Sequence, residues 1–261
     1  MRVFDGEVAV VTGAGTGVGA AVAVSLAQQR LKVALVGRRL SKLERTASRI
    51  RDENGQCETI SADVSNASDV ERVRQVCDGL GPVVILVNNA GVHCEMVPIS
   101  RSTPESWIQT LTINTVGPYL TCRYFMEDMV GHGWGRIFNI SSAASIGAPG
   151  SVGSVYQLSK VALNHLTRQV AAELEGTGVT ANAVHPGEVK TEMWAAIKEE
   201  SERRQDDNAR RWADMVDETG GDPPGKTAEL IVEMLAEEKD GVNGRFLWIR
   251  DGIQKPRPAW D

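Results

Sequence analysis

The sequence EVAVVTGAGTGVGAAVAV, residues 7–24, joins an apolar run to a glycine-rich loop and then to an apolar helical pattern. A strand before the loop and a helix after it are the context that a dinucleotide-binding loop requires. In such a loop Gly13 permits the tight turn, Gly17 lets the backbone approach a pyrophosphate, and Gly19 lets the helix pack against the strand. The helix N-terminus would present free N–H groups and a positive dipole end to the phosphates.

The rest of the chain alternates short apolar runs with longer amphipathic ones. Strands are predicted at 7–11, 32–36, 57–62, 83–87, 135–140, 180–184 and 245–249, and helices at 17–30, 40–53, 67–79, 103–131 and 155–175. Most of the strands are continuously apolar or β-branched, as in a sheet buried on both faces. The alternation predicts an α/β, doubly wound Rossmann-type fold with a central parallel sheet of about seven strands and helices on both faces.

No linker or low-complexity segment interrupts the pattern, so residues 1–261 are predicted to form one domain. The segment 192–225 departs from the alternation, because it is dense in charge and ends in Gly-Gly and Pro-Pro. Its sparse apolar anchors suit a substrate-covering lid, and a solvated helix pair on the surface is the alternative interpretation.

Composition excludes several classes of function. The net charge is −6 and there is no run of Lys or Arg, which argues against a nucleic-acid or anionic-membrane surface. The four cysteines form no Cys-x-x-Cys pair and the four histidines show no metal-ligand spacing, so reduced thiols and no metal site are expected. No apolar run approaches a membrane span and the amino terminus shows no signal pattern, so the cytoplasm is the expected location.

The stretch VYQLSK, residues 155–160, places Tyr156 and Lys160 one helical turn apart on one face. A fixed ammonium beside a phenol favours the phenolate and makes the pair usable in acid/base chemistry. Such a pair also arises by chance on a surface helix, so the other motifs must decide between the two interpretations.

Five further features occur in a consistent order. They are TGxxxGxG at 12–19, NNAG at 88–91, Asn114 in the helix that begins STPESW, the Ser pair at 141–142, and PGEVKTEM at 186–193. Together with Tyr156-x-x-x-Lys160 they resemble the short-chain dehydrogenase/reductase superfamily over residues 4 to about 252. Each motif alone is weak, and the set in this order is highly specific.

The resemblance implies an NAD(P)-dependent oxidoreductase acting on a carbonyl or secondary alcohol. It assigns the catalytic proton to Tyr156, contact with the nicotinamide ribose and lowering of the Tyr pKa to Lys160, polarisation of the carbonyl to Ser142, and a relay water to Asn114. Ser142 lies fourteen residues before Tyr156, one more than in many relatives, so Ser141 and Ser145 remain alternatives for the serine.

The second predicted strand ends in VALVGRR, which places Gly37 where an acidic residue would select a cofactor without a 2′-phosphate. Arg38 and Arg39 follow, and a guanidinium offers forked, charge-assisted donors to that phosphate. NADP(H) is therefore favoured, with NAD(H) as the alternative, because Thr16 replaces the basic residue that some NADP-using relatives carry. The expected cofactor-binding residues are Gly13, Thr16, Gly17, Val18, Gly19, Arg38, Arg39, Asp63, Val64, Asn89, Ala90, Gly91, Tyr156, Lys160, Pro186, Gly187, Val189 and Thr191.

The substrate is expected to be a small carbonyl or alcohol, of the 3-oxoacyl type or a related ketone. Loop positions at the carboxyl ends of the strands place residues 93–96, Ile146, Glu188 and Trp194 at the substrate pocket. The alternatives are an NAD(H)-dependent alcohol, sugar or steroid dehydrogenase, a non-catalytic nucleotide sensor, and a lyase or dehalogenase on the same fold. The resemblance also implies a homo-oligomer, a dimer or tetramer.

Overall fold

The computed structural model describes residues 2–148, 152–204, 207–236 and 241–253. Within them the strands build one sheet of order β3-β2-β1-β4-β5-β6-β7-β8, parallel up to β7. The strands are β1 (Val8–Thr12), β2 (Lys32–Gly37), β3 (Gln56–Ser61), β4 (Val83–Asn88), β5 (Gly135–Ile140), β6 (Val179–His185), β7 (Phe246–Trp248) and β8 (Gly252–Ile253). The predicted parallel sheet is confirmed, and β8 adds an eighth strand that runs antiparallel to β7.

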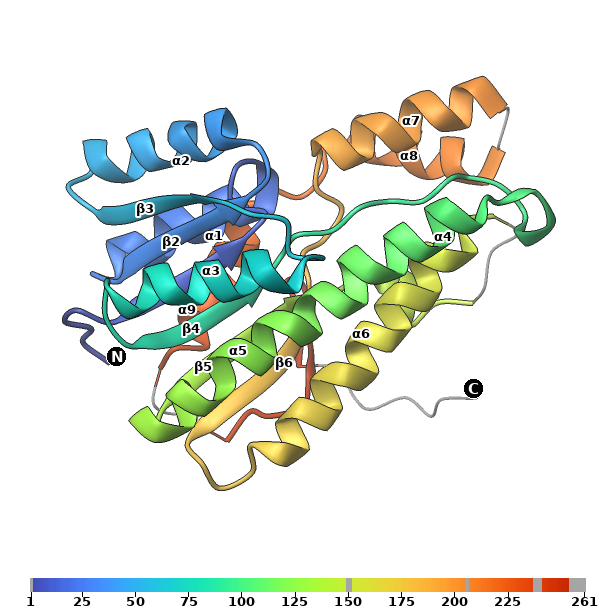
Figure 1. Ribbon diagram of the computed structural model, residues 1–261. Coiled ribbons are helices and arrows are strands. Elements are labelled where there is room, and N and C mark those ends of the chain that lie inside the picture. Colours follow the sequence, from blue (N-terminus) through green and yellow to red (C-terminus); the bar gives the residue numbers. More distant parts are fainter. Residues whose placement is uncertain (1, 149–151, 205–206, 237–240, 254–261) are drawn as a thin grey trace.

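Helices cover both faces of this sheet (Figure 1). One layer holds α3 (Ala67–Asp78), α5 (Gly117–His132) and α6 (Ser154–Glu173), and the other holds α1 (Gly17–Gln28), α2 (Leu40–Asp52) and α9 (Gly225–Glu233). Alternate residues of β1 face opposite layers, since Ala9 and Val11 pack with α1 and α9 whereas Val8 and Val10 pack with α3 and α5. Continuous apolar strands therefore supply two separate cores, one on each face.

The helix predicted at 103–131 is interrupted. The structure has α4 (Pro104–Leu111), a π-helical turn at Thr112–Val116, and then α5. Pro104 stands at the first turn of α4, where a missing N–H costs nothing, and Thr103 caps the helix through Ser106 N. The π turn carries Asn114, and π-bulges of this kind are frequent at functional sites.

The charged segment predicted at 192–225 contains two helices, α7 (Glu192–Arg204) and α8 (Asp207–Thr219). Figure 1 shows them as a pair lying apart from the two helix layers. Asp217 of α8 accepts from Lys190 at 2.8 Å and also from Lys198 of α7, which ties the pair together. None of the helices in the described residues is both long enough and apolar enough to cross a membrane.

Candidate active site

A cavity of about 660 Å³ lies where the chain leaves the carboxyl ends of the parallel strands. It extends from the β1–α1 loop and the start of α2, past the loop after β4, to the start of α6 and the first turn of α7. All the predicted cofactor-binding residues line it except Gly19. Among the predicted catalytic residues, Ser142, Tyr156 and Lys160 line it, whereas Asn114 lies behind its wall.

The glycine loop is built so that side chains cannot enter it. Gly13 and Gly17 have φ of +64° and +56°, which favour glycine. A Cβ at Gly19 would lie 2.4 Å from the Gly13 carbonyl oxygen, so Gly19 serves the packing of the loop rather than contact with the cavity. Thr16 caps α1 without a side-chain bond and the first turn carries no acidic residue, which leaves free N–H groups beside the cavity.

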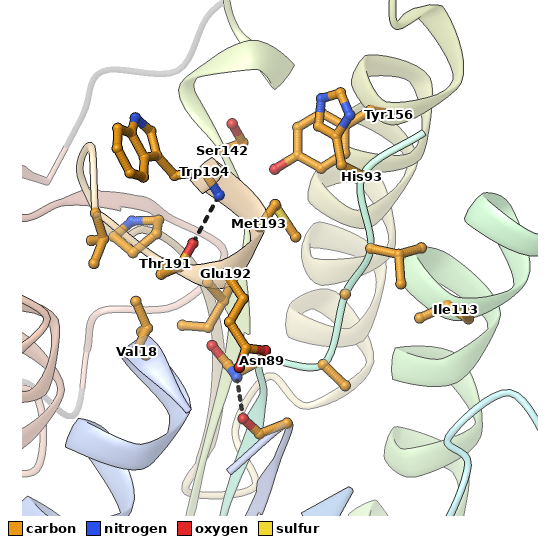
Figure 2. Close-up of a pocket in the computed structure, with 18 of the residues that line it drawn as sticks. Val18, Asn89, His93, Ile113, Ser142, Tyr156, Thr191, Glu192, Met193 and Trp194 are labelled. Carbon is orange, nitrogen blue, oxygen red and sulfur yellow. Dashed lines mark hydrogen bonds between the residues drawn. The ribbon is translucent and has the colours of Figure 1, made fainter. Parts of the chain in front are cut away.

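Asn88, the last residue of β4, and Asn89 directly after it hold the scaffold. Asn88 donates to Asn139 Oδ1 at 2.8 Å and accepts from Thr121 at 2.6 Å, which joins β4 to β5 and α5. Asn89 donates to the carbonyls of Thr12 and Gly13 at 3.0 and 3.1 Å. Figure 2 shows Asn89 beside Val18 at one end of the cavity.

Basic side chains gather at the end of the cavity nearest α2. Arg38, Arg39 and Lys42 all line it. Arg38 lies 3.9 Å from Asp63, whose Oδ1 also accepts from Ser65 N at 2.9 Å in a local turn. The backbone N–H of Asp63 itself donates to Asp69 at 2.7 Å. The position of Gly37 at the end of β2 leaves no acidic side chain there.

Tyr156, Ser142 and His93 meet at the opposite end of the cavity (Figure 2). The Ser142 hydroxyl, which accepts from Ala144 N at 3.2 Å, lies on the side of the cavity that the Tyr156 hydroxyl faces. The His93 ring lies 4.7 Å from the Tyr156 ring, tilted by 30°. Because His93 Nδ1 donates to the Cys94 carbonyl at 2.8 Å and burial lowers the pKa of His93, its ring is a neutral one stacked on the phenol.

The other two candidate serines are bonded to Asn164 on α6, although Ser141 also lines the cavity. Ser141 is buried and donates to Asn164 Oδ1 at 2.6 Å. Ser145 accepts from Asn164 Nδ2 at 2.8 Å and donates to the Ser142 carbonyl at 2.5 Å. Ser141, Ser145 and Asn164 therefore form a polar cluster that joins the loop after β5 to α6.

Lys160 lies behind Tyr156, with its Nζ 5.8 Å from the centre of the phenol ring. The Nζ donates to the Ile140 carbonyl at 2.8 Å, and burial lowers the pKa of Lys160 to about 8. Burial also raises the pKa of Tyr156, the nearby Ser142 hydroxyl opposes this rise, and Glu188 raises the pKa further. The expected lowering of the Tyr156 pKa by Lys160 is therefore not the dominant influence here, because desolvation opposes both charged forms.

Asn114 is fully buried in the π turn and holds the loop after β4 against α6. Its Oδ1 accepts from Val92 N at 2.9 Å, and its Nδ2 donates to the Val92 carbonyl at 2.9 Å and to Ser159 Oγ at 3.0 Å. A Cβ at Gly91 would lie 3.3 Å from Asn114 Oδ1 and 3.6 Å from Lys160 Nζ. The absence of a side chain at Gly91 thus keeps both polar groups near the cavity wall.

The segment after β6 brings the charged pair of helices to the cavity. Gly187 has φ of +81°, and a Cβ there would collide with the Asp222 carboxylate at 2.6 Å. Glu188 accepts from the indole N–H of Trp212, on α8, at 2.7 Å. Thr191 packs against Gly17 and accepts from Trp194 N at 3.3 Å, which caps α7 (Figure 2).

Some expected pocket residues lie elsewhere. His93, Met96, Glu188 and Trp194 line the cavity, whereas Cys94, Glu95 and Ile146 do not. Glu95 is turned toward the start of α4, where it accepts from Thr103 N at 3.1 Å and satisfies a helix end. Sequence reasoning missed Lys42, Glu192 and Trp212, whose positions in the cavity depend on contacts between distant segments.

The residues present fit a nicotinamide dinucleotide. The glycine cradle and the uncapped N-terminus of α1 suit a pyrophosphate, the Arg cluster suits an anion at the adenosine end, and a buried Lys160 beside Tyr156 suits a ribose hydroxyl. Within the described residues no group of His, Cys, Asp or Glu side chains could hold a metal ion, and all four cysteines are free thiols.

Comparison with known proteins points the same way. The sequence profile of the family described as short chain dehydrogenase matches residues 7–202. Galactitol 2-dehydrogenase (L-tagatose-forming) of Cereibacter sphaeroides is 30% identical over 251 residues, which cover 95% of each chain. The 3-oxoacyl-(acyl-carrier-protein) reductase of Aquifex aeolicus is 28% identical over 257 residues, covering 96% of this chain and 98% of that protein.

A solved structure of an actinorhodin polyketide ketoreductase variant with NADPH superimposes with a TM-score of 0.86. It is 27% identical, and the match covers 95% of this chain and 97% of that one. The structural similarity therefore extends beyond residues 7–202, the segment that the family profile matches.

Proposed function

The chain belongs to the short-chain dehydrogenase family, whose members are NAD(P)-dependent oxidoreductases, and we propose that it is an NADP(H)-dependent carbonyl reductase. The observation that carries this proposal is the layout of the cavity. Tyr156, Ser142 and Lys160 stand at one end of it, and Arg38 and Arg39 stand at the other. A dinucleotide that spans the glycine loop would place its nicotinamide at the first end and its adenosine ribose at the second.

At the reacting end, Tyr156 is the proton donor in carbonyl reduction. NADPH, when bound, would supply the hydride for the carbonyl carbon, and Tyr156 would give its phenolic proton to the carbonyl oxygen. Burial keeps the phenol protonated at neutral pH, because it raises the pKa of Tyr156. Ser142, which lines the same part of the cavity as Tyr156, holds the carbonyl oxygen within reach of both hydroxyls.

Lys160 and Asn114 support the donor from behind. Lys160 binds the nicotinamide ribose through its ammonium and stabilises the phenolate that remains after proton transfer. Asn114 positions the backbone of the loop at Val92 and, through Ser159, the helix that carries Tyr156 and Lys160. A water held near Asn114 then returns a proton toward Tyr156 by way of Lys160, as the family pattern implies.

The adenosine end selects the cofactor. Arg38 and Arg39 bind a 2′-phosphate, and Gly37 places no acidic side chain where a carboxylate would repel it. NADPH in the solved polyketide ketoreductase is consistent with this choice, since that protein shares the fold over nearly the whole chain. Asp63 and Val64 border the adenine position, with Asp63 held by its turn at Ser65.

The substrate occupies the cavity between Tyr156 and the helix pair α7–α8. Its walls are formed there by aromatic and thioether side chains with one carboxylate: His93, Met96, Met193, Trp194, Trp212 and Glu188. We assign residues 1–261 to one domain in which the segment 192–225 covers a ketone or 3-oxoacyl substrate. This substrate class is compatible with the names of two relatives. One is a galactitol dehydrogenase that forms the ketose L-tagatose, and the other is a reductase of a 3-oxoacyl group.

A panel of carbonyl compounds tests the proposal. The purified chain is mixed with NADPH or NADH and a ketone, a quinone, a 3-oxoacyl thioester or a steroid, and the loss of reduced nicotinamide absorbance is followed. Oxidation of NADPH by at least one carbonyl, at a higher kcat/KM than with NADH, supports the proposal. If NADPH and NADH both bind but no carbonyl compound of the panel oxidises either of them, the reductase assignment is contradicted.

A further inference from the structure

Glu192 joins the two sides of the cavity at its adenosine end. Its Oε2 accepts from Arg39 Nη2 at 2.6 Å, and its Oε1 lies 3.0 Å from Lys42 Nζ. The two cations stand at the start of α2, whereas Glu192 is the first residue of α7, 153 residues away from Arg39. The bonds to Arg39 and Lys42 lower the pKa of Glu192, so it is a carboxylate at neutral pH.

These contacts occupy the cations that a 2′-phosphate needs. Arg39 and Lys42 both line the cavity beside Gly37, and Glu192 itself lines it too. One carboxylate therefore holds one guanidinium and one ammonium, while Arg38 remains beside Asp63 at the longer distance of 3.9 Å. A phosphate dianion arriving at the same place must displace the carboxylate, because like charges cannot share the two cations without repulsion.

Glu192 also connects the adenosine end to the helix pair. The neighbouring Thr191 packs on Gly17 and caps α7, so the first turn of α7 lies against the glycine loop. If Glu192 loses Arg39 and Lys42, α7 loses its ionic attachment to α2. The position of α7 and the occupancy of the cation pair are thus coupled through one side chain.

We propose that Glu192 is a cofactor-selectivity residue that competes with the 2′-phosphate of NADP(H) for Arg39 and Lys42. The inference rests on the proposed function, because it requires a nicotinamide dinucleotide in this cavity. NADP(H) displaces the carboxylate and releases the first turn of α7 from α2. NAD(H), which has a hydroxyl in place of the phosphate, binds with the Glu192 contacts intact.

The expected change in NADPH affinity is modest, because the side chains of Glu192, Arg39 and Lys42 are all partly exposed. Exposed ion pairs of this kind are worth little each, so removing two of them should tighten NADPH by about three- to tenfold. NADH should change by less than about twofold, because its hydroxyl does not compete for the cations. The ratio of the two dissociation constants is therefore the quantity to measure.

Calorimetric titration with NADPH and with NADH, without substrate, measures both constants for wild type, Glu192→Gln and Glu44→Gln. Glu44 is the matched control, since it is a similarly exposed carboxylate on α2 that pairs with Arg51 at 3.3 Å and does not line the cavity. A selective gain in NADPH affinity in Glu192→Gln alone supports the proposal. An unchanged ratio, or the same gain in Glu44→Gln, overturns it.

Hydrogen exchange in the wild-type protein gives an independent test. Amides of residues 192–204 should exchange faster with saturating NADPH than with saturating NADH, because only the former releases Glu192. Equal protection in the two complexes overturns the proposal even when both cofactors bind. Binding of neither nucleotide to the wild type would instead contradict the proposed function itself, and the inference with it.

Discussion

At the scale of single residues, two adjacent serines have different surroundings. Both line the cavity, but the buried Ser141 hydroxyl donates to Asn164 of α6, whereas Ser142 lies beside Tyr156 (Figure 2). The motif and its spacing predicted a serine near the phenol and favoured Ser142, but the extra residue before Tyr156 left three candidates. The assignment of Ser142 stays a prediction, supported by the bonds that Ser141 and Ser145 make to Asn164.

Replacement of the two serines should separate their roles. Ser142→Ala is expected to lower kcat by about tenfold to 10³-fold, because one of the two hydroxyls at the carbonyl oxygen is lost. Ser141→Ala should keep kcat near wild type and instead lower the free energy of unfolding by about 1–2 kcal/mol, since Asn164 Oδ1 loses the hydroxyl that donates to it. Steady-state kinetics and urea unfolding of both variants provide the check. A larger loss of kcat in Ser141→Ala than in Ser142→Ala would assign the catalytic role to Ser141 instead.

Lys160 makes stability depend on pH in a defined direction. Its pKa is about 8 in the folded protein, whereas an unfolded lysine titrates near 10.4, so between these values the unfolded chain binds more protons. The stability contributed by this group therefore rises with pH from about 8 to about 10, as the cost of burying the ammonium disappears. Relative to wild type, Lys160→Met should gain stability below about pH 8 and lose that advantage as the pH rises.

Urea unfolding of both proteins between about pH 6.5 and about pH 9.5 measures this difference while Tyr156 stays protonated. A stability difference that is flat across the window would show that the Lys160 pKa is not lowered. The same pH series shows over which pH range Lys160 is an ammonium. The mechanism requires that form, because a neutral Lys160 cannot stabilise a phenolate.

At the scale of elements, the π turn at Thr112–Val116 is the feature that periodicity did not reveal. A helix was predicted without a break from 103 to 131, because one extra residue in a turn leaves the apolar pattern almost unchanged. The turn places the Asn114 side chain between the loop at Val92 and Ser159 on α6. The motif identified Asn114 as a functional candidate, while its three structural bonds became visible only in the folded chain.

Asn114→Ala should therefore affect stability as well as turnover. It leaves the Val92 N–H, the Val92 carbonyl and Ser159 Oγ with one partner fewer, and the free energy of unfolding should fall by about 2–4 kcal/mol. Thr112→Ala is the control within the same turn, because Thr112 bonds only the Ile108 carbonyl at a more exposed position. Its effect should stay below about 1 kcal/mol. A similar decrease in the free energy of unfolding in Asn114→Ala and Thr112→Ala would mean that the π turn does not depend on Asn114.

At the scale of the whole molecule, the strand–helix alternation predicted the parallel sheet and its two covered faces, because doubly wound topology follows from local patterns and right-handed crossovers. It did not predict the short antiparallel β8, which two residues form after a turn. It also missed the contact of Glu192 with Arg39 and that of Glu188 with Trp212. Such contacts depend on where whole elements come to rest, which residue periodicity does not encode.

Cofactor binding should stabilise the folded chain as a whole. At a free NADPH concentration about 100 times its dissociation constant, the free energy of unfolding should rise by about 2.7 kcal/mol. For a chain of this size that corresponds to an increase in Tm of about 5–10 °C in thermal scans. Arg38→Asp should remove most of the increase given by NADPH and leave that given by NADH, because only NADPH carries the 2′-phosphate. Equal losses with both cofactors would contradict a phosphate-reading role for Arg38.

The central claim is that Tyr156 delivers the proton at the end of the cavity opposite the arginines. The most direct measurement compares wild type with Tyr156→Phe in a single turnover of bound NADPH with an excess of the best carbonyl substrate. If Tyr156 is the proton donor, the Tyr156→Phe rate should be lower by about 10²- to 10⁴-fold, with the dissociation constant of NADPH within about threefold of wild type. A rate within about tenfold of wild type, at full cofactor occupancy, would contradict it.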